Sequence, residues 1–274
     1  MKIYLMTDLE GVAGVQNSED WCSSEGRYYD TAKMLLTEEV NAAVDGFFEG
    51  GAREILVVDG HGSGGIAPEL LDARVEFLRG YIGGENYTLG WSLDKSFDAI
   101  AWVGQHAKAG TEYAHLAHTG NMGVIDLSVN GISIGELGKL AMCASEIGVR
   151  SIFASGDEAM TKEAQELIPG IECISVKRGL SPGTGDELIT EKYRKKNSPA
   201  IHLSPIKARQ LIRAGALNAI KRARAENFGI ITFKPPYERI FVKRPDKEGD
   251  PKMVSREIHE TSIGELFCLP MRYL

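Results

Sequence analysis

Cysteine is scarce in this sequence, and the few cysteines lie far apart. There are four among 274 residues, at Cys22, Cys143, Cys173 and Cys268. No pair has the close spacing of a zinc ribbon or of a redox dithiol. We therefore expect reduced thiols, packed as small apolar side chains, in a cytoplasmic protein.

Long apolar runs are also missing. The first apolar run, at residues 3–6, stops at Asp8 after only a few residues, which is too short for the apolar region of a signal peptide. No later run approaches the ~20 apolar residues that a membrane span requires. We expect no leader segment and no association with a membrane.

An excess of positive charge is the third absence. The formal net charge is −7 and the isoelectric point is about 5.5. Basic runs such as 194–196 are short and fit the solvated end of a helix. Because phosphate neutralisation needs clustered Lys and Arg, we expect no nucleic-acid partner.

Strands and helices alternate through the first two thirds of the chain, and 43% of all residues are hydrophobic, which is ample for a core. Strands are expected at 2–7, 54–59, 98–104, 151–154 and 172–177, with helices at 31–49, 135–147 and 161–167. A hairpin is expected over 127–134, folded at Asn130-Gly131. The alternation predicts an α/β fold with a mostly parallel, helix-covered sheet.

The sequence changes character between residues 179 and 199, where Gly, Pro, Ser and charged residues predict a loop or linker. A long amphipathic helix begins at Ser204-Pro205, and strands are expected near 229–233 and 239–243. We expect a catalytic α/β domain over 1–189 and a smaller α+β unit over 190–274.

Three expected strands end in residues that can bind a metal. Asp8 and Glu10 follow the first strand, Asp59 and His61 the second, and His106 the third. Each lies in a turn that contains glycine, which lets the chain bend sharply off a strand. Because functional groups collect beyond the carboxyl ends of parallel strands, these side chains are expected to lie close together.

A further acid, Glu136, opens the helix after the hairpin and could point back at the strand ends. Imidazole and carboxylate are the ligands of catalytic zinc, and this set exceeds the needs of one ion, so it suits a bridged pair. Each residue also has a plainer interpretation: the acids as turn caps, a favourable charge at a helix start for Glu136, and the histidines as surface or core-edge residues.

Two more histidines, His115 and His118, lie in a polar stretch between His106 and the hairpin. Either could polarise a substrate, transfer a proton or stabilise an oxyanion, since imidazole titrates near neutral pH. The alternative is a loop histidine without a role.

Two tempting motifs do not predict a site. Residues 62–65 are glycine-rich, but no Gly-Lys-Ser/Thr follows, so they do not form a phosphate-binding P-loop. Residues 131–135 match the Gly-x-Ser-x-Gly frame, but the first glycine belongs to the hairpin turn. Ser133 is therefore interpreted as an ordinary strand serine and not as a nucleophile.

Several short segments follow one another in the order of a known family. They are Thr7–Gly11, Val58–His61, Gly104–Ala107, His118 and Gly135–Gly138, with shorter matches at 37–39, 155–157, 167–169 and 203–208. At these residues the sequence resembles the zinc-dependent D-aminopeptidases of the bacterial dipeptide-transport operon type. The resemblance runs in order from about residue 1 to residue 225.

The resemblance implies a ligand set and an activity. By it, two zinc ions are bound by Asp8, Glu10, His61, His106 and Glu136, and His118 is the catalytic histidine. It implies removal of N-terminal D-residues from short peptides or amino-acid amides, by a homo-oligomer that assembles as a decameric ring. Gly60 departs from the serine often found there, and the loop from His106 to His118 is about one residue longer.

Three other functions remain open. A dinuclear-metal amidohydrolase acting on a non-peptide amide would use the same ligands. A non-catalytic scaffold in peptide uptake would be expected to lose a ligand, and this chain keeps all five. A metal-dependent phosphoesterase would need an Arg or Lys near the motifs to hold phosphate, and none is obvious there.

Overall fold

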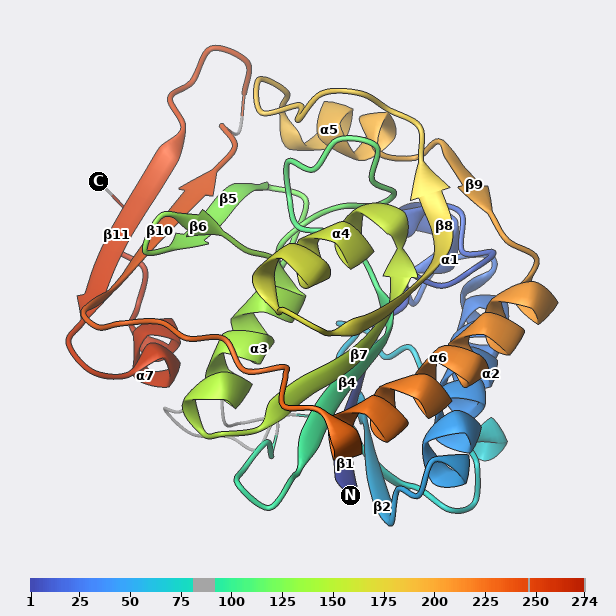
Figure 1. Cartoon of the computed structure of the whole chain (residues 1–274). Coiled ribbons are helices and arrows are strands. Elements are labelled where there is room, and N and C mark those ends of the chain that lie inside the picture. Colours follow the sequence, from blue (N-terminus) through green and yellow to red (C-terminus); the bar gives the residue numbers. More distant parts are fainter. Residues whose placement is uncertain (81–91, 246, 274) are drawn as a thin grey trace.

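The computed structural model describes residues 1–80, 92–245 and 247–273 (Figure 1). Its largest element is a seven-stranded sheet that is parallel except for the last strand. The strands, in spatial order, are β3 (Glu76–Leu78), β2 (Glu54–Asp59), β1 (Lys2–Thr7), β4 (Ala99–Gln105), β7 (Arg150–Asp157), β8 (Glu172–Gly179) and β9 (Ala200–His202). The expected α/β fold is confirmed.

Helices cover both faces of this sheet (Figure 1). One face is covered by α2 (Tyr29–Glu49) and α6 (Pro205–Ala225), which pack side by side, and the other by α3 (Glu136–Glu146) and α4 (Glu158–Leu167). The buried residues of α2 recur three or four positions apart, as in Leu36, Val40 and Val44, so one stripe of the helix faces the strands.

A second sheet has four antiparallel strands and lies beside the main sheet (Figure 1). Its order is β11 (Met253–His259), β10 (Tyr237–Lys243), β5 (Val124–Val129) and β6 (Ile132–Ser133). The β5–β6 hairpin turns at Asn130 and Gly131, with φ angles of 50° and 80°, as a two-residue hairpin turn requires. The hairpin expected from Asn-Gly is confirmed.

The remaining helices are short: α1 (Ser18–Trp21), the 3-10 turn η1 (Pro68–Leu70), α5 (Thr190–Lys196) and α7 (Ile263–Cys268). Helix α5 lies inside the segment expected to be a loop. That expectation was wrong. Helix α5 buries one side chain, Tyr193, so its sequence has no apolar stripe from which a helix could be predicted.

A strand was expected near residues 229–233, and this was also wrong. Gly229, with φ of 88°, accepts a hydrogen bond from the Ser151 amide through its carbonyl, but the segment joins neither sheet. The expected division into a domain over 1–189 and a smaller unit over 190–274 stays a prediction. The sheets themselves do not divide there, because β9 pairs with β8 and β10 pairs with β5.

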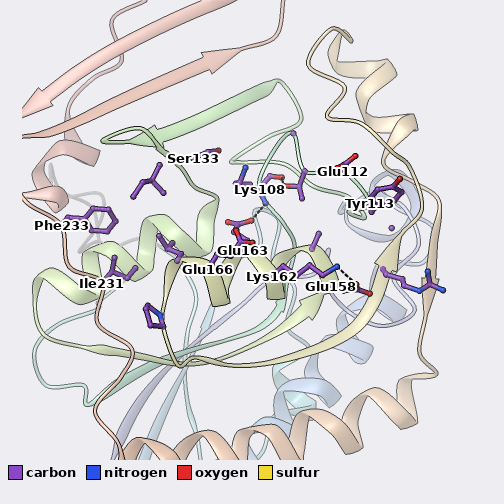
Figure 2. A pocket seen from close by; sticks show the side chains of 18 of the residues that line it. Lys108, Glu112, Tyr113, Ser133, Glu158, Lys162, Glu163, Glu166, Ile231 and Phe233 are labelled. Carbon is purple, nitrogen blue, oxygen red and sulfur yellow. Dashed lines mark hydrogen bonds and ion pairs between the residues drawn. The ribbon is translucent and has the colours of Figure 1, made fainter.

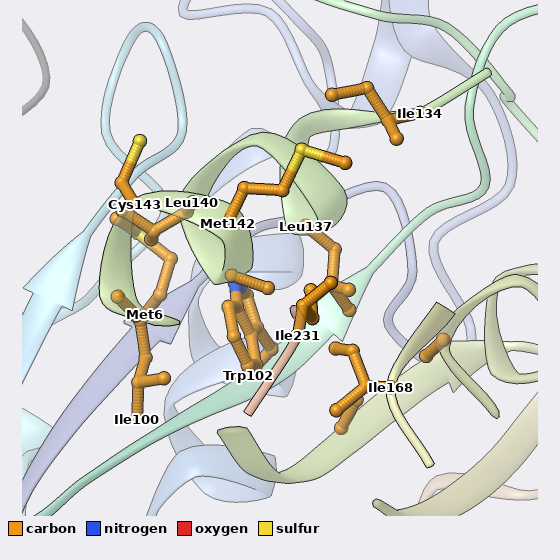
Figure 3. Close-up of a cluster of buried hydrophobic side chains, with 14 of the residues drawn as sticks. Met6, Ile100, Trp102, Ile134, Leu137, Leu140, Met142, Cys143, Ile168 and Ile231 are labelled. Atoms are coloured by element: carbon orange, nitrogen blue, oxygen red, sulfur yellow. The ribbon is translucent and has the colours of Figure 1, made fainter. Parts of the chain in front are cut away.

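Among the described residues, none of the helices combines the length and the hydropathy that a membrane span requires. The face under α3 shows where the apolar side chains go instead (Figure 3). Leu137 and Leu140 from α3 pack with Trp102 of β4 and Met6 of β1, and all four are at most 9% exposed. This packing fixes α3 over the two central strands.

The chain reverses its direction across the sheet between β1 and β4. From β1 it proceeds through β2 to β3 on one side, and from β4 through β7 to β8 on the other. In open parallel sheets, ligands bind in the crevice outside the carboxyl ends of the strands at such a reversal. The fold thus predicts a binding site beside Asp8 and His106.

Glycine lets the chain segments beyond β1 and β4 lie in contact. The Asp8 amide donates to the Val103 carbonyl at 3.0 Å, and the Gly11 amide to the Gly104 carbonyl at 2.7 Å. Gly104 has φ of 78°, and a Cβ there would lie 2.0 Å from the Asp8 carbonyl oxygen. Only glycine satisfies both conditions.

We predict that Gly104→Ala lowers the free energy of unfolding by about 3 kcal/mol or more, because it combines backbone strain with a steric clash. Gly148→Ala is the matched control, since Gly148 has φ of 82° with open space around it, and should cost about 1 kcal/mol. Urea denaturation measures the free energy of unfolding of both variants and of the wild type. Equal losses would contradict the close approach.

Candidate metal centre

The residues expected to bind metal surround one cavity of about 420 Å³ at the carboxyl ends of the central strands. Asp8, Glu10, His61 and Glu136 line it, together with His118. His106 lies just behind this lining and is 3% exposed, with its Nε2 3.2 Å from Asp8 Oδ2. The structure thus brings all six predicted site residues together.

His61 is held by a loop with its own anchors. The Asp59 carboxylate accepts hydrogen bonds from the Gly65 amide at 2.9 and 3.0 Å, so Asp59 shapes the loop from within. The Arg79 guanidinium donates to the carbonyls of His61 at 2.7 Å and Gly62 at 2.8 Å. These bonds fix the turn that carries His61 toward Asp8 and Glu10.

Each of the three histidines has one ring nitrogen on a backbone carbonyl. His61 Nε2 donates to the Cys22 carbonyl at 2.7 Å, His106 Nδ1 to that of Ala107 at 2.9 Å, and His118 Nδ1 to that of Leu116 at 2.9 Å. Such a bond fixes the ring orientation and, in the neutral ring, leaves the other nitrogen as an acceptor.

The other nitrogen of each ring faces carboxylates. His61 Nδ1 lies 3.2 Å from Asp8 Oδ1 and 3.1 Å from Glu10 Oε2. His106 Nε2 and His118 Nε2 lie 3.7 and 3.8 Å from Glu136 Oε1. Acceptor atoms at these separations repel one another unless a proton or a metal ion lies between them.

The pKa values show how strongly this cluster attracts positive charge. Burial lowers the pKa of His61, but Glu10 and Asp8 raise it by more, to about 12. Burial likewise opposes protonation of His106, yet Glu136 and Asp8 raise its pKa to about 10. Burial disfavours the charged form of Asp8, but the neighbouring imidazoles of His106 and His61 outweigh it and hold its pKa well below the usual range.

The donor atoms fit a metal ion. In the described part of the chain, Asp8, Glu10 and His106 bring donor atoms within 4.8 Å of one another, and so do His106, His118 and Glu136. Two buried atoms of the set, Glu10 Oε2 and His106 Nε2, have no hydrogen-bond partner among the described residues. Imidazole nitrogen with carboxylate oxygen is the donor set of catalytic zinc.

His118 and His115 differ in whether the ring reaches the cavity, and this decides which of them can act there. The ring of His118 stacks on that of His106, with centroids 3.9 Å apart and planes 15° apart. His115 is fully buried away from the cavity, where its Nε2 bonds to the Gln16 carbonyl and burial lowers its pKa to about 2. Of the two, His118 alone lines the site.

Ser133, in the Gly-x-Ser-x-Gly frame, lies at another cavity. Its hydroxyl donates to the Asp126 carboxylate within the hairpin, and it lines a larger cavity that contains none of the expected ligands. The interpretation as a strand serine is confirmed.

Sequence reasoning missed a buried cation behind the site. Lys177, on β8, is 2% exposed, and its ammonium donates to the carbonyls of Glu10, Val12 (3.1 Å) and Val15 (3.4 Å). Burial lowers its pKa to about 8, against the pull of nearby acids led by Asp157. The only signal is a lysine inside a mostly apolar strand.

Gln105 was missed as well. Its side-chain amide donates to Asp8 Oδ2 at 3.3 Å. It therefore orients the carboxylate oxygen that faces His106. Its place next to His106 was the available signal.

Two known proteins are similar to this chain, one in sequence and one in structure. A curated D-aminopeptidase from Bacillus subtilis (strain 168) is 30% identical over 201 residues, which are 70% of this chain and 72% of the relative. A solved structure described as a Zn-dependent D-aminopeptidase DppA from Bacillus subtilis, a self-compartmentalizing protease, superposes with a TM-score of 0.81. That match covers 97% of this chain and 94% of the other at 23% identity, which establishes the shared fold.

The family comparison covers most of the sequence. The family model of the M55 peptidases, described as D-aminopeptidase, matches residues 1–247. The chain therefore belongs to the M55 D-aminopeptidase family.

Proposed function

We propose that this protein is a zinc-dependent aminopeptidase that releases N-terminal D-residues from short peptides or amino-acid amides at a dinuclear metal site. The proposed ligands are Asp8, Glu10, His61, His106 and Glu136. The observation that carries the proposal is the set of three imidazoles, each anchored to a carbonyl and each turned toward a carboxylate of the site.

Zinc bound at such a site lowers the pKa of a water toward neutrality and polarises the carbonyl to be cleaved. The chain's own residues supply the remaining functions. The free α-amine of a substrate has two partners open to it: a carboxylate of Asp8 or Glu10, both nine-tenths buried, or a bound metal. Met6, Trp102 and Leu140 line the same cavity and provide an apolar wall for its side chain.

His118 is the proposed catalytic histidine. Because its Nδ1 donates to the Leu116 carbonyl, its Nε2 is free to exchange a proton on the side of the cavity. An imidazole in this place can give a proton to the leaving amine or stabilise a developing oxyanion.

The size of the cavity supports short substrates, since about 420 Å³ accommodates a dipeptide or an amino-acid amide. Assembly as a homo-oligomer, in a decameric ring, is part of the proposal; its support is the self-compartmentalizing relative of the same fold. So is a cytoplasmic location, which the small number and wide spacing of the four cysteines support.

We expect the purified chain to hold about two zinc ions and to hydrolyse D-Ala amide faster than L-Ala amide. Mass spectrometry of the metal content and an amine-release assay on one sample test both statements. Asp8→Asn should lose zinc, whereas Asp250→Asn, an exposed loop residue, should not.

The outcomes of that experiment separate the alternatives. Two zinc ions with neither amide cleaved would favour a hydrolase of non-peptide amides. No tightly bound metal after reconstitution with zinc would refute the site.

We predict that His118→Ala lowers turnover by ~10²–10⁴-fold while the zinc content stays near that of the wild type. Tyr113→Ala is the control, since Tyr113 lies in the same stretch, is 54% exposed and lines the other cavity. Steady-state kinetics and metal analysis check the two readouts. Full turnover would remove His118 from the chemistry, and a loss of zinc would make it a ligand instead.

A further inference from the structure

A second cavity, of about 1100 Å³, is lined in part by Lys108, just after His106, and by Ser133, just before Glu136 (Figure 2). Lys108, Glu163 and Glu166 line it. Glu163 and Glu166 come from α4, and Figure 2 shows the Glu163 carboxylate beside Lys108. Glu166 is exposed, whereas Glu163 is partly buried.

Glu163 joins two chain segments through one carboxylate. Its Oε2 accepts a hydrogen bond from the Lys108 amide at 2.9 Å, and its Oε1 accepts one from the Gly135 amide at 3.1 Å. Lys108 follows His106 by two residues, and Gly135 directly precedes Glu136. The carboxylate therefore holds together the backbone that carries one proposed ligand and the backbone that carries another.

Gly135 fits this arrangement because it has no side chain. A Cβ at this position would lie 2.9 Å from Glu163 Oε1 and 2.9 Å from the Lys108 Cβ. The backbone of Gly135 has φ of −101°, so its conformation does not by itself require glycine. Close packing against Glu163 and Lys108 is what excludes a larger residue.

Gly135 is also the N-cap of α3, and as a glycine it provides no side-chain cap. The amides at a helix start need acceptors, and a negative charge there is favourable. Glu163 supplies that charge from a neighbouring helix. At the other side of the same helix start, Glu136 Oε1 accepts the Gly120 amide at 2.7 Å.

We propose that Glu163 is a positioning residue that sets the separation of His106 and Glu136 and thereby the zinc affinity of the site. This inference rests on the proposed function, since it concerns the same ligands. A carboxylate suits the task because each of its two oxygens accepts an amide. Glutamine in its place would keep one acceptor and turn an NH₂ group toward the other amide.

Glu163→Gln tests the inference, with Glu166→Gln as the matched control on the next turn of the helix and at the same cavity. The zinc dissociation constant is measured by competition with a chromogenic chelator. The expected result is a ~10–100-fold weaker affinity in Glu163→Gln, as for other residues that orient metal ligands, and no change in Glu166→Gln.

Melting temperatures with zinc removed and restored provide a readout that a purely structural role would not move. Positioning predicts that zinc raises the melting temperature of Glu163→Gln by less than it raises that of the wild type. Equal zinc-induced increases together with wild-type affinity would overturn the inference.

A second variant approaches the same contact from the opposite side. Gly135→Ala keeps the Glu163 carboxylate but forces it and Lys108 away, so it should weaken zinc binding in the same range. Wild-type affinity in both variants overturns the inference alone. A wild-type chain that binds no zinc overturns the proposed function and this inference with it.

Discussion

The parallel pairing of β1 with both of its neighbours is the constraint on which the site depends. Thr7 lies opposite Asp59 of β2 and opposite Val103 of β4, so three strands end at nearly the same level. Parallel strands in register deliver the next few residues of each chain segment to one edge. Asp8 and His106 face each other at 3.2 Å because their strands are adjacent and end together.

The second requirement is electrostatic, and the acids and histidines of the site meet it for one another. Buried acids are costly unless charge or hydrogen bonds compensate them. Here the imidazoles of His61 and His106 compensate Asp8. Side chains outside the ligand set hold the backbone around them: Lys177 binds the carbonyls of Glu10 and Val12, and Arg79 binds those of His61 and Gly62. The backbone segments that carry Glu10 and His61 are therefore held in place from outside the ligand set.

Sequence periodicity predicted most of the sheet and the edge at which the ligands meet, because both follow from local patterns. Strand ends, glycine turns and the Asn-Gly hairpin need only a few consecutive residues. The stack of His118 on His106, the anchors Lys177 and Glu163, and the burial of Tyr193 in α5 arise from residues far apart in the chain. Such contacts leave no periodic trace, and extended residues such as 229–233 satisfy a strand pattern without finding a ladder.

The pairing of β10 with β5 has a consequence for the order of events during synthesis. Val129 of β5 pairs with Arg239 of β10, so β5 lacks this neighbouring strand until the ribosome has synthesised β10. A domain generally folds as a unit, so strands that are made early depend on partners that are made later. β1, β2 and β4 are synthesised before β5, whereas the hairpin that leads into α3 gains this neighbour only after β10 has been made. The hairpin that leads to Glu136 therefore completes its own sheet only after a strand more distant in the chain than any other proposed ligand has been synthesised.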